Sequence, residues 1–155
     1  MKITQTKIPE VFIIEPSIFE DERGYFYESF QEKKYREYIG EVTFVQDNIS
    51  RSAKNTLRGL HLQNAEYAQG KLCQVLLGAV LDVVVDIRFG SPTYGQYIFV
   101  ELTSENKKQI WIPPGFAHGF SVLSDSVLFH YKRTNYYHKA SERCLIYNDP
   151  TLHID

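Results

Sequence analysis

The stretch AVLDVVVDIR, residues 79–88, has the pattern of a buried β-strand whose two faces differ. Successive side chains of a strand point to opposite sides, so Val83 and Val85 share one face while Asp82 and Asp86 share the other. A strand that is largely aliphatic and still carries acids on one face fits a closed barrel with a polar mouth. We therefore expect this second face to line a polar cavity or to meet solvent.

Short runs of the same kind fill most of the remaining chain. β-Branched and aromatic residues dominate each run, and turn residues such as those in FGSPTYG, SEN and PPG separate them. The expected strands are residues 11–14, 25–30, 41–50, 56–63, 71–78, 79–88, 96–103, 108–113, 119–124 and 126–137. Many short strands at this spacing predict an all-β sandwich or barrel.

One segment has helical rather than strand periodicity. From Gln31 to Tyr38, apolar residues recur on one stripe that includes Tyr35 and continues to Ile39. Gly40 is well placed to end a helix. The sequence therefore predicts one short N-terminal helix in an otherwise all-β chain.

The composition restricts the class of partner. The 155 residues contain no repeat and no linker-like stretch, so we expect a single domain over residues 1–155. A formal net charge of −2 argues against nucleic acid or an anionic membrane as the main partner, although local Arg and Lys can still bind a small anion. Two cysteines, Cys73 and Cys144, make no disulfide framework, and MKITQTKIPE lacks an apolar signal core. These features predict a cytoplasmic protein.

The stretch IWIPPGFAHGF, residues 110–120, places a tight Pro-Pro-Gly corner before a strand that carries His118. It resembles the second conserved motif of cupins, which are small jelly-roll-like barrels. The first motif of metal-binding cupins supplies two histidines and a glutamate. Here the corresponding region offers His61, but Gln63 occupies the position of the second histidine and Glu66 is its only acid. A first-row metal site generally needs three or four such ligands, so we expect no metal and disfavour a metal-dependent cupin oxygenase or isomerase.

A set of motifs in this sequence resembles, in order, the dTDP-4-dehydrorhamnose 3,5-epimerase family from about residue 10 to the end. The motifs are DERGYFYESF, FVQDNIS, LRGLHLQ, GKLCQVLLGAVLDVVVDIRFGSPTYG, WIPPGFAHGFSVLSD, YKRTNYY and YNDPTLHID. The resemblance implies a cupin barrel, usually a homodimer, that needs neither metal nor cofactor. It also implies a nucleotide-linked 4-keto-6-deoxy sugar as substrate, inverted at a carbon next to the ketone.

The resemblance assigns three catalytic residues. His61 matches the family base, Tyr131 matches the acid on the opposite face, and Lys71 matches the cation near the developing oxyanion. Inversion next to a ketone requires these groups, because the base forms an enolate that needs positive charge and a proton from the other side. A lone strand histidine is more often structural than catalytic, so this assignment for His61 depends on the whole set of motifs.

The same resemblance implies a set of substrate-binding residues. Arg58 matches an arginine that contacts pyrophosphate, and Arg23, Phe26 and Glu28 match residues that hold phosphate, stack on the base and hydrogen-bond it. In the family these last residues come partly from the neighbouring subunit. Phe26 could equally be a core residue, and an exposed ring would favour stacking. The remaining expected positions are Gln46 and Asn48 near the sugar or nucleotide, and His118 and Tyr137 in the pocket wall.

Arg58 and His61 are separated by an odd number of residues, so a regular strand would send them to opposite faces. Both can face one cavity only if the strand contains a bulge or twist. Glycine suits such a position. We therefore predict irregular strand pairing at Gly59.

The end of the sequence departs from the family. The family's C-terminal segment follows the motif that ends at Asp155 here, and it carries an aspartate that hydrogen-bonds the base histidine. With that segment apparently absent, Asp82 is our candidate to orient His61.

The sequence leaves the reaction partly open. Inversion could occur at C3, C5 or both, and the substrate could be another nucleotide sugar such as a GDP-heptose. A cupin that binds a nucleotide sugar without catalysis is the alternative class.

Overall fold

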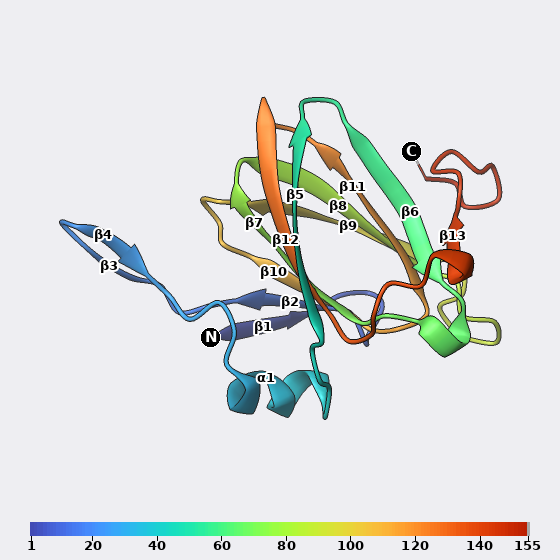
Figure 1. The fold of residues 1–155 in the computed structure, drawn as a ribbon, viewed down its shortest axis with the longest axis horizontal. Helices are drawn as coiled ribbons and strands as arrows, with labels where there is room; N and C mark the ends of the chain where they lie inside the picture. Colours follow the sequence, from blue (N-terminus) through green and yellow to red (C-terminus); the bar gives the residue numbers. More distant parts are fainter. Residues whose placement is uncertain (155) are drawn as a thin grey trace.

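The computed structural model describes residues 1–154, in which two β-sheets pack together and a two-stranded hairpin projects to one side (Figure 1). The first sheet is antiparallel, with strand order β1-β2-β10-β7-β12-β5. Its strands are β1 (Lys2–Gln5), β2 (Phe12–Glu15), β10 (Gln109–Ile112), β7 (Lys71–Leu77), β12 (Ser126–Arg133) and β5 (Gln46–Ala53).

The second sheet is also antiparallel, with strand order β13-β6-β11-β8-β9. Its strands are β13 (Glu142–Cys144), β6 (Leu57–Gln63), β11 (Phe116–Val122), β8 (Ala79–Asp86) and β9 (Tyr97–Thr103). The main core contains residues of both sheets, such as Val75 and Phe129 from the first and Val84 and Phe120 from the second. Two sheets over a shared core form the all-β, jelly-roll-like barrel that the sequence predicts.

Helix α1 (Glu32–Ile39) covers the outer face of the first sheet (Figure 1). Its first turn is capped by Gln31, whose side-chain oxygen accepts a hydrogen bond from the Lys34 amide at 2.7 Å. Gly40 ends the helix with a φ of 80°, a conformation that favours glycine. On the buried side Tyr35 packs in a cluster with Trp111, confirming the predicted helix.

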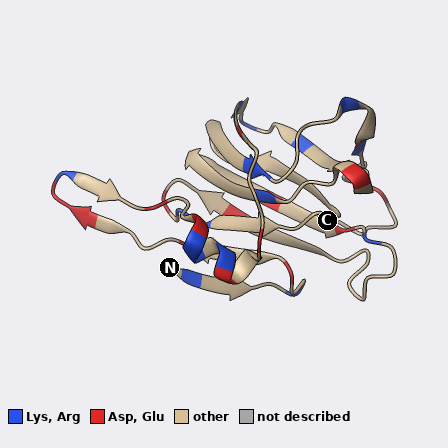
Figure 2. Cartoon of the chain, turned by 60° about the horizontal axis from the view of Figure 1, so that its bottom comes forward, with Lys and Arg blue, Asp and Glu red and all other residues tan. Residues whose placement is uncertain are grey.

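The hairpin consists of β3 (Phe19–Asp21) and β4 (Gly24–Phe26) and extends away from both sheets (Figure 1). A strand was expected over residues 25–30, but it ends at Phe26. The reason is that Phe30 turns back to the barrel, where its ring lies 5.0 Å from that of Tyr35. The charged residues of the hairpin gather at its tip (Figure 2).

The outer face of the second sheet is apolar and covered. Leu60 of β6 and Val83 and Val85 of β8 are buried there, and Leu152 and Ile154 from the end of the chain pack against them. Burying aliphatic side chains of this size stabilises a fold by roughly 1.5–3 kcal/mol each. The C-terminal residues are thereby held against the strand that carries His61.

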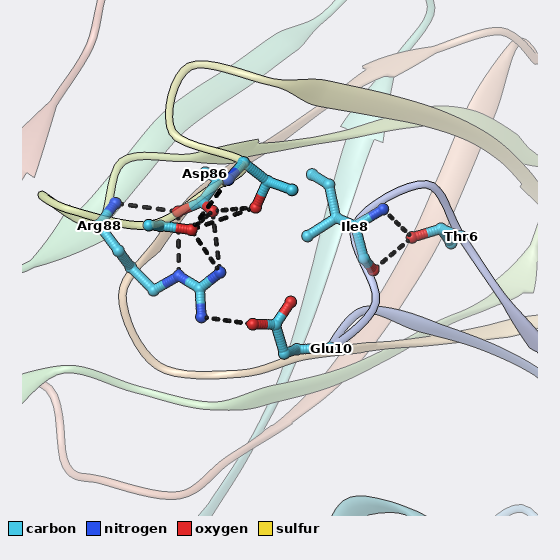
Figure 3. Close-up of polar contacts among 7 residues, drawn as sticks. Thr6, Ile8, Glu10, Asp86 and Arg88 are labelled. Carbon is cyan, nitrogen blue, oxygen red and sulfur yellow. Dashed lines mark hydrogen bonds and ion pairs between the residues drawn. The ribbon is translucent and has the colours of Figure 1, made fainter.

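The acids on the other face of β8 are both fully buried. Asp86 accepts hydrogen bonds from Arg88, Ser91 and Thr93, and Arg88 also donates to Glu10 (Figure 3). Burial opposes ionisation of Asp86, but these hydrogen bonds outweigh it and hold the pKa of the carboxyl well below its usual range. The network joins the end of β8 to the loop before β2.

Arg88 also shapes the Pro-Pro-Gly corner before β11. Its guanidinium lies 4.4 Å from the centre of the Phe116 ring. A Cβ added to Gly115 would come within 2.9 Å of the Arg88 Cγ, and Gly115 has a φ of +96°. Glycine is therefore required at this corner, and Arg88 fixes the start of β11.

No helix within residues 1–154 has the length and apolar character needed to cross a membrane.

Candidate active site

A cavity of about 190 Å³ opens between the two sheets of the barrel. It is smaller than the roughly 300–1,000 Å³ of most small-molecule pockets, so it can enclose a sugar ring more readily than a whole nucleotide sugar. Its wall contains six of the residues predicted from the sequence: Arg58, His61, Lys71, His118, Tyr131 and Tyr137.

A bulge at Gly59 turns Arg58 and His61 toward this cavity. His61 pairs with His118 and Arg58 pairs with Phe120, so β6 has one more residue than β11 across this interval. The φ of Gly59 is +107°, and an added Cβ would lie 2.6 Å from the His118 carbonyl oxygen. The predicted irregularity is therefore confirmed, and only glycine fits there.

His61 lies at the cavity edge with its side chain about half exposed, at 47%. Its Nδ1 is 3.6 Å from Oε1 of Glu142 on β13, and among residues 1–154 no carboxylate forms an ion pair with its Nε2. Burial lowers the pKa of His61 and the Lys71 ammonium lowers it further, whereas Glu142 acts in the opposite direction. The imidazole is thus favoured in the neutral form that can accept a proton.

The hypothesis that Asp82 orients His61 is wrong. Oδ2 of Asp82 lies 2.8 Å from Nε2 of His118, and both side chains are buried. Burial raises the pKa of Asp82, with His118 opposing it, and within residues 1–154 its Oδ1 has no hydrogen-bond partner. Asp82 therefore fixes His118, and the carboxylate beside His61 is that of Glu142.

Tyr131 lies on β12, next to the edge strand β5 of the first sheet, and its hydroxyl accepts a hydrogen bond from Nη2 of Arg133 at 2.8 Å. The two residues are separated by two positions on β12, so their side chains share the face that lines the cavity. Sequence reasoning did not single out Arg133, although this spacing could have indicated it.

Lys71 begins β7, directly opposite Arg133 in the strand register. Burial lowers the pKa of its ammonium group, and no carboxylate within residues 1–154 forms an ion pair with it. The cavity wall thus holds three Lys and Arg side chains, while Glu142 is its only carboxylate in this part of the chain. Such a charge balance favours an anionic ligand.

Tyr137 and Glu142 form a second polar pair in the cavity wall. The Tyr137 hydroxyl donates to Oε2 of Glu142 at 2.8 Å, at the same end as His61. Glu142 was missed in the sequence because nothing there indicates that residues 142–144 pair with β6.

Gln46 and Asn48 lie on β5, on the same face as the cavity residue Ser50, but they do not themselves line the cavity. Their side-chain amides are 2.9 Å apart. In the orientation that satisfies both of its polar atoms, the Asn48 amide oxygen accepts from the Tyr131 hydroxyl at 3.3 Å and from Arg133 Nε at 3.2 Å. Asn48 therefore reaches the cavity through Tyr131.

The predicted nucleotide-binding residues of the hairpin region do not reach this cavity. Arg23 pairs with Asp21 at the hairpin tip, and Glu28 pairs with Lys34 of α1. The ring of Phe26 is exposed, at 66%. The structure thus separates the predicted site into a cavity group and a hairpin group.

The profile of the dTDP-4-dehydrorhamnose 3,5-epimerase family matches residues 5–155. The chain belongs to this family. The epimerase of Salmonella typhimurium is 54% identical over the whole chain and 85% of its own length.

Two solved structures agree with the family assignment. The dTDP-6-deoxy-D-glucose-3,5-epimerase of Legionella pneumophila, in complex with dTDP-4-keto-L-rhamnose, is 59% identical with a TM-score of 0.96, covering 99% of this chain and 82% of its own. A 3'-monoepimerase of Streptomyces bikiniensis, in complex with dTDP-quinovose, is 32% identical with a TM-score of 0.91, covering 97% and 76%.

All residues that line the cavity lie within the region that matches the dTDP-4-dehydrorhamnose 3,5-epimerase family. Across residues 1–154 there is no group of three or more His, Cys, Asp and Glu side chains arranged to hold a metal ion.

Proposed function

We propose that this chain is an epimerase of a dTDP-linked 4-keto-6-deoxy sugar, with dTDP-4-keto-6-deoxyglucose as substrate and dTDP-4-keto-rhamnose as product. The observation that carries the proposal is the convergence of His61, Lys71 and Tyr131 on one cationic cavity. These residue types supply a base, a cation and an acid. Inversion next to a ketone needs these three groups and no cofactor.

The reaction follows from these groups. The C4 ketone acidifies the neighbouring C–H bond, His61 takes the proton, and the electron pair forms an enolate. Lys71 stabilises the enolate oxygen, which suits an ammonium group that no carboxylate in residues 1–154 pairs with. Tyr131 then gives its hydroxyl proton to the opposite face of the carbon, inverting it, and solvent restores both groups to their starting protonation states.

The nucleotide binds beyond the cavity in this proposal. Arg58, whose Nε donates to Ser52 at 2.8 Å, contacts the pyrophosphate from the cavity wall. The chain acts as a homodimer, in which Arg23, Phe26 and Glu28 of one subunit hold the nucleotide at the other subunit's cavity. Support comes from the exposed ring of Phe26 and from the small size of the cavity. Gln46 and Asn48 lie near the sugar part of the bound substrate in this proposal.

The proposal includes a single catalytic domain over residues 1–155 that works in the cytoplasm. Cytoplasmic conditions suit two cysteines that form no disulfide, one buried and one exposed. Inversion at both C3 and C5 is favoured over one position, because the similarity to the Legionella 3,5-epimerase exceeds that to the Streptomyces 3'-monoepimerase.

The test is incubation with dTDP-4-keto-6-deoxyglucose in deuterated water, with and without chelator, followed by NMR of the sugar. We expect deuterium at C3 and C5 in an inverted product, unchanged by chelator. Deuterium at one position would indicate a monoepimerase, and binding without any deuterium would indicate the non-catalytic alternative. Loss of activity with chelator would indicate a metal-dependent reaction.

Tyr131→Phe tests the assigned acid within the same assay. It should abolish inversion, while Tyr136→Phe, which alters an exposed tyrosine of the same motif, should not. Normal inversion by Tyr131→Phe would contradict the role of Tyr131.

A further inference from the structure

Arg133 is a cation of the cavity wall that the proposed reaction does not use. Its Nη2 donates to the Tyr131 hydroxyl at 2.8 Å, and its guanidinium carbon lies 4.8 Å from the centre of the Tyr131 ring. Within residues 1–154 no carboxylate forms an ion pair with it. The guanidinium instead contacts neutral groups: the Tyr131 phenol, the Asn48 amide oxygen at 3.2 Å from Nε, and the Tyr137 ring, whose centre is 5.9 Å from the guanidinium carbon.

The direction of that hydrogen bond matters for proton transfer. A phenol has one O–H donor and can accept at its oxygen. Because Arg133 occupies an acceptor position, the Tyr131 proton must point elsewhere. Asn48 lies within 3.3 Å of the hydroxyl as an acceptor on β5, and the cavity is the other direction open to the proton. Arg133 thus orients the hydroxyl as a donor.

The charge of Arg133 matters after the proton has left. When Tyr131 gives its proton to carbon, the oxygen becomes a phenolate only 2.8 Å from the guanidinium position. The guanidinium is cationic throughout, so its partner changes from a neutral phenol to an anion, and the attraction between the two groups increases as the proton is transferred. Interactions that strengthen along the reaction are the ones that accelerate it.

The register across the sheet supports this division of roles. Lys71 and Arg133 are direct partners on neighbouring strands, and the Arg133 guanidinium adds to burial in lowering the pKa of Lys71. Two such cations are useful together where two anions develop. The reaction creates an enolate oxygen and a phenolate oxygen, one for each cation.

We infer that Arg133 is a positioning residue for Tyr131, which it holds as a proton donor and stabilises as a phenolate. This inference depends on the proposed function, because it assumes that Tyr131 reprotonates the enolate. Arg133 acts through Tyr131 and needs no contact with the sugar.

The experiment compares exchange with inversion in deuterated water for wild type, Arg133→Met and Arg133→Lys. His61 can return a solvent deuteron to the face from which it removed the proton, which labels the substrate without inverting it. We expect Arg133→Met to lower inversion by about 10- to 100-fold, the range for a charged hydrogen bond, while exchange falls much less. Arg133→Lys should restore part of the inversion because it restores the charge.

The control is Lys132→Met, which removes a cation from the next position of β12, where the side chain pairs with Asp47 at 2.9 Å. It should leave the ratio of exchange to inversion unchanged. If Arg133→Met loses exchange and inversion to the same extent, or inverts the substrate normally, the inference is overturned while the proposed function stands. If wild type shows neither exchange nor inversion, the proposed function fails and the inference fails with it.

If Arg133→Met does not fold, as judged by circular dichroism and dTDP binding, the ratio in Arg133→Lys decides. A ratio of exchange to inversion equal to that of wild type would then reject the inference, because lysine cannot reproduce the guanidinium geometry at the hydroxyl. A raised ratio would support it.

Discussion

The barrel cavity and the β3–β4 hairpin carry two groups of predicted site residues, and they hold their side chains in different ways. In the cavity, His118 is 6% exposed and hydrogen-bonded to a fully buried Asp82. On the hairpin, Phe26 is 66% exposed and Arg23 forms an ion pair with the nearby Asp21. One chain is therefore sufficient to fix the proposed chemistry, whereas the proposed nucleotide contacts need a second surface. Changes in the cavity should affect kcat, and changes in the hairpin should affect KM.

The largest effect is expected for His61→Asn. Loss of the base should lower both exchange and inversion by about 10³-fold, while the dissociation constant for dTDP, measured by calorimetry, stays within about twofold because the hairpin is intact. His153→Asn alters an exposed histidine and serves as the control. Exchange at the normal rate in His61→Asn would show that another group is the base.

Gly59→Ala should have the next largest effect. Its Cβ would lie 2.6 Å from the His118 carbonyl oxygen and 2.7 Å from the Gly119 Cα, at a φ of +107°. We expect a loss of about 2–4 kcal/mol in the free energy of unfolding and about 10²-fold in kcat, measured by urea denaturation and initial rates.

The matched control for this change is Gly24→Ala in the hairpin, where φ is +133° but no described residue other than its chain neighbours has an atom within 4 Å of the added Cβ. It should cost about 1–2 kcal/mol with kcat unchanged. Equal losses of kcat in the two variants would contradict the proposed separation of cavity and hairpin.

Phe26→Ala should raise KM by about tenfold, because stacking of a base on an aromatic ring is worth about 1–3 kcal/mol, with little change in kcat. Mixing this variant with His61→Asn under conditions that exchange subunits sharpens the comparison. A heterodimer combines one intact cavity with the partner's intact hairpin, so activity at low substrate should recover. If activity does not recover although mass spectrometry verifies the heterodimers, then the hairpin serves the cavity of its own chain or takes no part in catalysis.

The smallest effect concerns pH. The pKa of His61 is lowered first by burial and then by Lys71, while Glu142 raises it. The rate should fall as pH falls through this pKa, because protonated His61 cannot act as base. Glu142→Gln removes the raising influence, so the acid limb of kcat/KM should move to lower pH by less than about one unit. Glu22→Gln at the hairpin should leave the limb in place, and a shift of the limb to higher pH in Glu142→Gln would be inconsistent with the geometry.

Local patterns predicted much of the fold. Alternation identified β8, the apolar stripe and Gly40 identified α1, and an odd spacing predicted the bulge at Gly59. These features depend on neighbours in sequence, so sequence is sufficient to find them. The same holds for the proximity of Tyr131 and Arg133, which was available from their spacing.

Contacts between strands distant in sequence were not predictable in the same way. Asp82 was paired with the wrong histidine, because the choice depends on the register of β8 against β11, where Asp82 lies opposite Phe120. Glu142 was missed because β13 is only three residues long and acquires its position from β6. The same contact with β6 determines the surroundings of Cys144, which is exposed, whereas Cys73 is buried.

The position of Cys144 provides an experimental handle. It lies directly across from His61 in the β13–β6 register and is accessible, whereas Cys73 is fully buried, with a thiol whose pKa burial raises. A fluorinated thiol reagent should therefore label Cys144 alone in the folded protein and place an NMR probe beside the proposed base. Cys73 would react only as the barrel opens, so the two thiols of one unmodified chain can report separately on ligand binding and on unfolding.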